Sequence, residues 1–142
     1  MKKKIPASKI RVLLAKPGLD GHSVGIRLIA QALRDQGFEV IFIGIRQKNQ
    51  TIINAAIQES VDAIGMSMLS GAHISIMEEF TSKLKKSKFN PVVVVGGVIP
   101  GVDHGKLLEL GVDAVFDTKD SFDDMADFIR DRVESKRALG SA

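Results

Sequence analysis

Short apolar runs without polar alternation recur along the chain, and each is followed by a segment with helical periodicity. The runs cover residues 10–15, 38–43, 63–66, 92–95 and 114–116, and the helical segments cover 24–36, 50–59, 74–86, 103–110 and 121–136. Strands that are apolar on both sides belong in a parallel sheet with helices on both faces. The sequence therefore predicts an α/β fold with a doubly wound, five-stranded parallel sheet of the Rossmann-like or flavodoxin-like type.

Glycines and short polar residues mark the expected ends of these segments. Gly37 is expected to end the first helix, and Ser70, Asp103 and Ser121 are expected to cap the starts of three later ones. We expect one domain over residues 10–136, with flexible tails at 1–9 and 137–142.

The composition excludes several classes of function. The 142 residues include no Cys, which removes thiolate metal sites, and no Trp or Tyr, which argues against stacking surfaces for nucleic acid. The net charge of +3 equals the charge of Lys2, Lys3 and Lys4, so no basic face for nucleic acid or a membrane is indicated. No apolar stretch approaches about 18 residues and no export signal is recognisable, so the sequence predicts a cytoplasmic protein.

The loop after the first apolar run holds a cation, a carboxylate and an imidazole among glycines. In a sheet of this kind, ligands bind beyond the carboxyl ends of the strands, where this loop lies. The Asp20 carboxylate can accept from one ring nitrogen of His22 and leave the other free for a metal, while Lys16 keeps Asp20 charged. The alternative is an exposed turn that is only shaped by Pro17, Gly18 and Gly21.

One histidine does not make a protein-built metal site, because zinc needs three or four protein ligands. His73 and His104 lie on other loops, and joint coordination by all three histidines is an alternative. A single protein ligand suits a metal that arrives inside a macrocycle.

Two later loops also reach this edge of the predicted sheet. Ser67 directly follows the third apolar run, so its hydroxyl is expected to face the crevice. Gly96 and Gly97 follow the fourth run, where they allow a ligand to approach the backbone or, equally, tight packing under the strand.

Together these residues resemble the cobalamin-binding domain family. Its pattern is Asp-x-His-x-x-Gly after the first strand, Ser-x-Leu after the third and Gly-Gly after the fourth, which here are Asp20–Gly25, Ser67–Leu69 and Gly96–Gly97. The similarity covers residues 9–133. Within the family, the chain looks most like the small subunit or carboxyl-terminal domain of adenosylcobalamin-dependent acyl-CoA mutases, the methylmalonyl-CoA mutase family, through residues 12–22, 30–41 and 69–73.

The resemblance implies a role for each matching residue. His22 is the implied lower axial ligand of cobalt, replacing the cofactor's own dimethylbenzimidazole, whose nucleotide tail enters the domain. Asp20 orients His22, and Lys16 supports Asp20. The other residues implied to contact the cofactor are Gly21, Ser23, Val24, Gly25, Ser67, Leu69, Gly71, Gly96 and Gly97.

The same resemblance implies the assembly and the reaction. The cofactor is adenosylcobalamin, the reaction is a carbon-skeleton isomerisation, and this chain holds no catalytic residue of its own. A separate large subunit with an acyl-CoA-binding TIM barrel completes a heterotetramer, and this chain alone is inactive. The segment Phe116–Asp120 departs from the Phe-Gly-Pro-Gly-Thr of many methylmalonyl-CoA mutases, which leaves a 2-hydroxyisobutyryl-CoA or isobutyryl-CoA mutase as an alternative.

Other classes remain as alternatives. A corrinoid carrier for methyl transfer or cofactor delivery shares the fold but usually has a helical domain before it. A signalling receiver needs an Asp where this chain has Ser67, and a flavodoxin needs a hydroxyl-rich first loop. The cluster Lys83, Lys85, Lys86 and Lys88 is read either as a docking face or as a solvated helix end.

Overall fold

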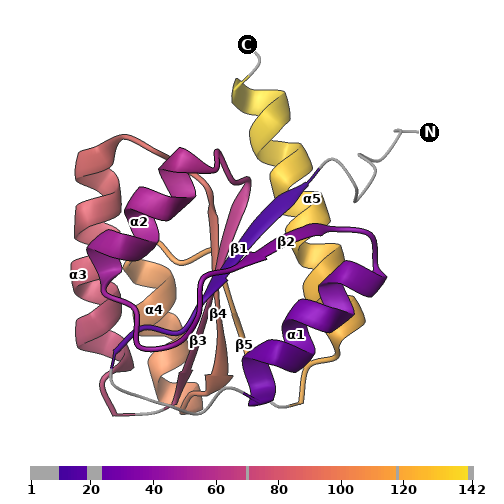
Figure 1. The fold of residues 1–142 in the computed structure, drawn as a ribbon. Coiled ribbons are helices and arrows are strands. Elements are labelled where there is room, and N and C mark those ends of the chain that lie inside the picture. The colour runs from indigo at the N-terminus through magenta and orange to yellow at the C-terminus, as the bar shows by residue number, and fades with distance from the viewer. Residues whose placement is uncertain (1–9, 19–23, 70, 118, 141–142) are drawn as a thin grey trace.

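All five expected strands are present in the described part of the chain and lie parallel in one sheet (Figure 1). The computed structural model describes residues 10–18, 24–69, 71–117 and 119–140. The sheet order is β2-β1-β3-β4-β5. The strands are β1 (Arg11–Ala15), β2 (Glu39–Phe42), β3 (Ala63–Leu69), β4 (Val92–Val98) and β5 (Ala114–Phe116). This order reverses direction between β1 and β3, where sheets of this topology bind ligands.

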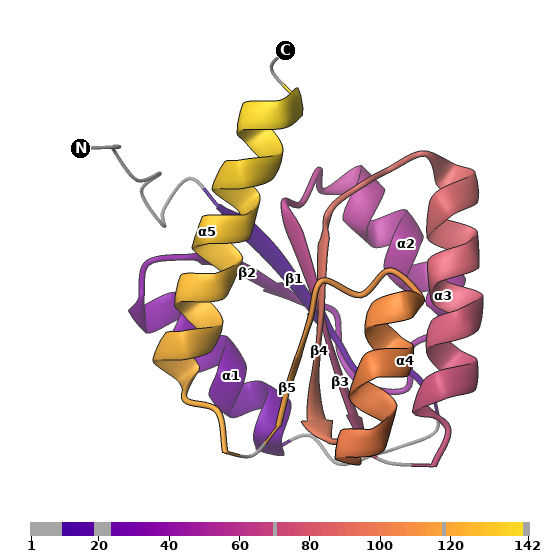
Figure 2. The ribbon, with the colours of Figure 1, turned by 180° about the vertical axis from the view of Figure 1, so that it is seen from behind.

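Helices cover both faces of the sheet, as expected. One face carries α1 (Val24–Asp35) and α5 (Phe122–Gly140), and the other carries α2 (Asn49–Gln58), α3 (His73–Ser87) and α4 (His104–Glu109), as Figures 1 and 2 show. A single 3₁₀ turn, η2 (Gly101–Asp103), precedes α4. No helix in the described ranges is long and apolar enough to cross a membrane.

Each strand contributes side chains to two separate cores. In β4, Val93 and Val95 pack under α2, α3 and α4, while Val92 and Val94 pack under α1 and α5. All four valines are buried. A strand that is buried on both faces has no polar alternation, which is why the apolar runs predicted the sheet correctly.

Two strands are longer than the sequence predicts. β3 continues to Leu69 and β4 to Val98, so Ser67, Gly96 and Gly97 are strand residues and not loop residues. Ser67 pairs with Gly96, and Met68 pairs with Gly97. The pairing of neighbouring strands extends both elements past their apolar runs, a tertiary effect that local patterning does not reveal.

The expected helix caps have different outcomes. The Ser121 hydroxyl accepts from the backbone N–H of Asp124 at 3.0 Å, which confirms the expected cap of α5. Asp103 stands at the expected N-cap position of α4 but makes no side-chain cap bond there, and its carboxylate accepts from His73 instead. Ser70 lies outside the described residues, and the residue that precedes α3 is Ala72.

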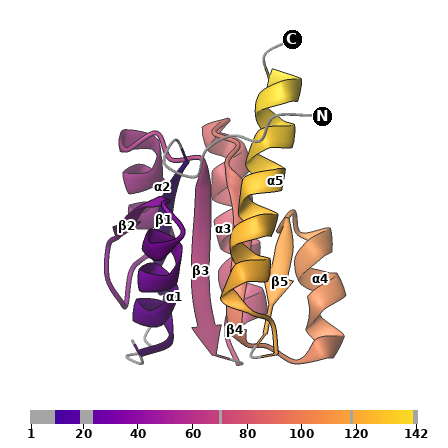
Figure 3. The ribbon, with the colours of Figure 1, turned by 90° about the vertical axis from the view of Figure 1, so that its right-hand side faces the viewer.

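Helix α5 is fastened to the amino edge of the sheet. It runs to Gly140, past the expected domain end at residue 136 and past the amino ends of the strands (Figure 3). Arg137 lies 3.0 Å from the Asp62 carboxylate, and Arg132 lies 3.3 Å from that of Asp113. These two aspartates directly precede β3 and β5, so the last turns of α5 are tied to two strands.

Candidate functional site

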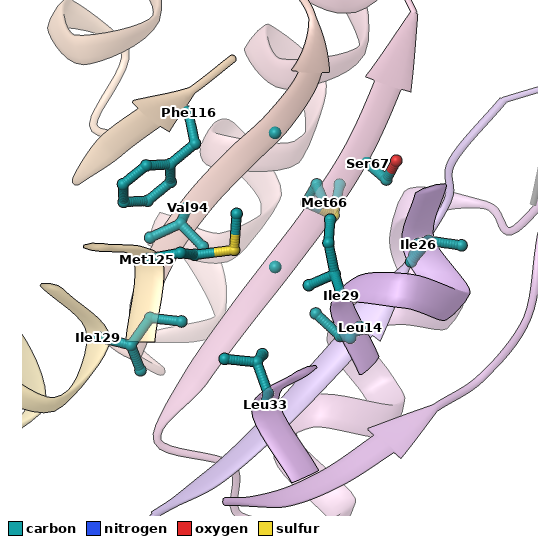
Figure 4. A pocket seen from close by; sticks show the side chains of 12 residues that line it. Leu14, Ile26, Ile29, Leu33, Met66, Ser67, Val94, Phe116, Met125 and Ile129 are labelled. Carbon is teal, nitrogen blue, oxygen red and sulfur yellow. The ribbon is translucent and has the colours of Figure 1, made fainter. Parts of the chain in front are cut away.

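A pocket lies between α1, α5 and the face of the sheet that these helices cover (Figure 4). It is narrow, with a cavity volume of about 20 Å³, and it is partly open to solvent. Its lining residues are Leu14, Ile26, Ile29, Leu33, Gly65, Met66, Ser67, Val94, Gly96, Phe116, Met125 and Ile129. Ser67 has the one polar side chain among these described lining residues, so the pocket suits an apolar group with a polar contact at one point.

The two helices supply opposite walls of the pocket. Ile26, Ile29 and Leu33 share one face of α1, and Met125 and Ile129 are one turn apart on α5. Residues spaced by three or four positions lie on the same side of a helix, so both walls are apolar over two turns.

Two glycines, Gly65 and Gly96, form part of the floor of the pocket between these walls. A Cβ on Gly65 would lie 2.6 Å from Cδ2 of Leu14, so the Leu14 side chain uses the space that Gly65 leaves. A Cβ on Gly96 would meet nothing closer than the Phe116 carbonyl oxygen at 3.8 Å. The strand backbone is therefore bare at Gly96, and a ligand can lie directly against it.

The loop after β1 begins from a firmly held base. The backbone N–H of Lys16 donates to the Gly44 carbonyl at 3.3 Å, and its carbonyl accepts from the N–H of Gln47 at 3.0 Å. The Lys16 side chain is buried, with 3% exposed. A buried ammonium group requires polar or anionic partners, and the expected support of Asp20 by Lys16 stays a prediction.

The central residues of the predicted site fall outside the described part of the chain. These are Asp20, Gly21, His22 and Ser23, so their roles stay predictions. Val24, the first residue of α1, is exposed, and a Cβ on Gly25 would meet no atom within 4 Å. The start of α1 therefore leaves room for a ligand beside this loop.

Three further predicted residues lie at the ends of β3 and β4. Gly71 is exposed and has a φ of +126°, with no atom near its missing Cβ. Gly97 is not among the lining residues and packs against the backbone of Met68, in line with the tight-packing alternative. Leu69 ends β3, and its side chain is outside the described part.

The other two histidines already have partners. His73 Nε2 lies 2.8 Å from Asp103 Oδ2, and its Nδ1 accepts from the Gly71 N–H at 3.2 Å. His104 Nε2 lies 3.2 Å from the Ile99 carbonyl oxygen. The described residues contain no group of three or more His, Cys, Asp or Glu side chains placed to hold a metal ion. These bonds count against a site built by all three histidines.

Sequence reasoning missed Gly65 and the apolar walls of the pocket. A lone glycine inside an apolar strand signals a close approach of another group, and Gly65 gave that signal. The wall residues gave none, because an apolar helix face that lines a pocket has the same periodicity as one that fills a core.

Comparison with known proteins identifies the family of the chain. The B12 binding domain family matches residues 10–124. The 2-hydroxyisobutanoyl-CoA mutase small subunit of Aquincola tertiaricarbonis is 42% identical over 104 residues, which are 72% of this chain and 76% of that subunit. The ethylmalonyl-CoA mutase of Methylorubrum extorquens is 43% identical over 111 residues, which are 78% of this chain but only 16% of that enzyme.

A solved structure shares the fold. The crystal structure of a cobalamin-binding protein from Desulfitobacterium hafniense superimposes with a TM-score of 0.73 at 22% identity, over 85% of this chain and 57% of that one. At this identity the likeness establishes the fold alone. The family match itself spans most of the sequence, including all five strands. This protein belongs to the B12-binding domain family.

Proposed function

We propose that this chain is the cobalamin-binding small subunit of an adenosylcobalamin-dependent acyl-CoA mutase, an isomerase. The observation that carries the proposal is the apolar pocket between α1 and α5 with its bare strand backbone at Gly96. The mutase names of two relatives above 40% identity support the reaction class.

The lining of the pocket suits the nucleotide tail of the cofactor. Dimethylbenzimidazole is a flat apolar group, and the facing apolar walls of α1 and α5 would bury such a group over the Gly96 backbone. The cavity of about 20 Å³ is smaller than this group, so α1 and α5 would have to move apart on binding. The hydroxyl of Ser67 offers a hydrogen bond to a polar atom of the tail. Gly25 leaves room for the tail beside the first turn of α1, and Leu69 and Gly71 complete the proposed contacts at the end of β3.

His22 is the proposed lower ligand of cobalt. A tail base held in the pocket would be away from the metal, so the protein would have to supply the replacement ligand. Asp20 is proposed to accept from the second ring nitrogen and fix the orientation of the imidazole. The burial of Lys16 at the base of the same loop supports its proposed role as the cation that keeps Asp20 ionised.

The reaction divides between cofactor, chain and partner. Adenosylcobalamin, when bound, would supply a cobalt–carbon bond for radical chemistry. The residues of this chain would bind the tail, orient the His22 imidazole and present the cofactor at the carboxyl edge of the sheet. A large catalytic subunit with an acyl-CoA-binding barrel is the proposed partner, in a heterotetramer.

The partner sets the acyl-CoA in this proposal. The two relatives act, by their names, on different acyl-CoA compounds yet are 42% and 43% identical to this chain. Similarity in the cobalamin domain therefore tracks the cofactor and not the substrate.

Titration of the purified chain with adenosylcobalamin tests the proposal. We expect a spectrum in which the cofactor's own base has left cobalt and a histidine has replaced it. His22→Ala should remove that signature, and His104→Ala should keep it, because His104 bonds within its own loop. Binding with the cofactor's base still on cobalt, or an unchanged spectrum for His22→Ala, overturns the ligand assignment.

A second measurement tests the enzyme class. Isomerisation should require both this chain and a copurifying barrel subunit. Copurification with a methyltransferase, with methyl transfer in place of isomerisation, would identify a corrinoid carrier instead.

A further inference from the structure

His73 is buried at the carboxyl edge of the sheet, where α3 begins. Only 5% of it is exposed, although it is a polar residue beside an exposed turn. Its ring lies on the face covered by α2, α3 and α4, whereas the pocket lies on the opposite face. His73 therefore has a place at the functional edge without lining the proposed tail pocket.

The hydrogen bonds define the protonation of the ring. The backbone N–H of Gly71 donates to Nδ1 at 3.2 Å, so Nδ1 carries no hydrogen. Nε2–H then donates to the Asp103 carboxylate at 2.8 Å. The neutral imidazole thus acts as an acceptor on one side and as a donor on the other, and both nitrogens are used.

These two bonds join turns that follow neighbouring strands. Gly71 belongs to the turn between β3 and α3, and Asp103 belongs to η2, which follows β4. The strands that lead into these turns carry Ser67 and Gly96, which pair with each other and line the pocket. The imidazole therefore bridges two turns that continue directly from the pocket floor.

The Asp103 carboxylate bonds to His73 and not to the backbone of α4, its own helix. It stands at the N-cap position of α4, where an aspartate usually accepts from a backbone N–H, but it makes no such bond. The carboxylate makes a different bond instead. It accepts a short hydrogen bond from the buried ring of His73, which lies 30 residues away in the sequence.

We propose that His73 and Asp103 are positioning residues that hold the turns after β3 and β4 in the form that accepts cobalamin. This inference rests on the proposed function. Without the bridge, the Gly71 turn and η2 would sample other arrangements, and only a fraction of molecules would be ready to bind. The apparent affinity falls by that fraction, while the contacts in the pocket stay the same.

The test compares variants that keep or remove the bridge in the purified full chain. His73→Phe keeps the buried volume and removes both bonds, whereas His73→Gln keeps one acceptor and one donor. Asp103→Ala leaves the ring in place and removes its acceptor. His104→Phe is the matched control, since His104 lies at the same edge but its hydrogen bond goes to the Ile99 carbonyl of its own loop.

The measurements are the dissociation constant for adenosylcobalamin and, separately, the unfolding midpoint without cofactor. We expect His73→Phe and Asp103→Ala each to weaken binding about tenfold, and the double variant to be no weaker than either single one. His73→Gln should recover most of the affinity, and His104→Phe should bind like the wild type.

The outcomes separate this inference from the proposed function. If the wild type does not bind cobalamin, the proposed function fails. If the wild type binds and both single variants lower the unfolding midpoint without changing the dissociation constant, the bridge is only structural and the inference fails. If His73→Phe does not fold, Asp103→Ala decides alone, because Asp103 is partly exposed and its truncation leaves the core intact.

Discussion

Gly97 in β4 lies against the backbone of Met68 in β3 so closely that a Cβ on Gly97 would overlap with the Met68 carbonyl oxygen. Its φ of +131° is also one that side chains disfavour. The preceding residue, Gly96, pairs with Ser67 and faces open space in the pocket. Two adjacent glycines thus serve different ends, one in strand pairing and the other in the floor of the pocket.

Replacing Gly97 with alanine should damage the fold itself. The new Cβ has to displace a backbone carbonyl, and the backbone at this φ is strained for any side chain. We expect Gly97→Ala to lower the free energy of unfolding by about 3 kcal/mol or more. Urea unfolding of the chain without cofactor measures this, and a loss below about 1 kcal/mol would contradict the close approach.

Replacing Gly96 with alanine should separate binding from stability. Its Cβ has room in the apo chain, so the free energy of unfolding should stay the same or rise by about 1 kcal/mol at most, because alanine lowers the entropy of the unfolded chain. The methyl group would occupy the floor where the proposed tail lies. Binding of adenosylcobalamin should therefore weaken about tenfold or more.

Gly105→Ala is the matched control for Gly96→Ala. Gly105 lies in α4, on the other face of the sheet, and its Cβ would meet no atom within 4 Å. We expect unchanged binding and a small gain in stability from the better helix former. Equal affinity of the Gly96→Ala and Gly105→Ala variants would show that the tail does not use the pocket.

The fold followed from the sequence because its signals are redundant. Five apolar runs and five helical periodicities agree with one topology, and Gly37 and Ser121 mark helix ends where expected. The errors lie where neighbouring strands decide the outcome. The extensions of β3 and β4 and the role of Asp103 depend on contacts between residues that are distant in sequence.

The sequence suggests only the polar part of the candidate site. A carboxylate, an imidazole and a lysine at one strand end are rare enough to indicate chemistry at Lys16, Asp20 and His22, and the roles of these residues stay predictions. The pocket could not be predicted, because its wall residues have the sequence pattern of ordinary core residues. Only the spacing of α1 and α5 shows that they line a pocket. The hydrogen bond between His73 and Asp103 could not be predicted either, because the two residues are 30 positions apart in the sequence.

The cap of α5 offers a local test of one wall of the pocket. Ser121 Oγ accepts from the Asp124 N–H, which would otherwise lack a partner within the helix. Ser121→Ala should lower the free energy of unfolding by about 1 kcal/mol, and Ser121→Asp should retain most of it. Thermal or urea unfolding of both variants checks this, and equal losses for Ala and Asp would mean that the hydroxyl is not acting as a cap.

The same pair of hydrogen bonds, made by an aspartate, occurs twice at the amino edge of the sheet. The Asp62 N–H donates to the Arg11 carbonyl, while its carboxylate accepts from the Arg11 N–H at 2.8 Å. Asp113 exchanges the same two bonds with Val93, at 2.7 and 2.8 Å. Each aspartate therefore adds one side-chain hydrogen bond, here called the rung, to the pairing of two neighbouring strands. Cationic side chains of α5 lie close to both carboxylates.

Variants of Asp62 and Arg137 should separate the rung from the ion pair. Asp62→Ala leaves the Arg11 N–H without its acceptor, and we expect a loss of about 1–3 kcal/mol in the free energy of unfolding. Arg137→Ala removes a partly exposed ion pair with Asp62 and should cost about 0.5 kcal/mol or less. Asp62→Asn keeps an acceptor oxygen and should fall between them. If Arg137→Ala is as harmful as Asp62→Ala in urea unfolding, the end of α5 stabilises the sheet edge more than the rung does.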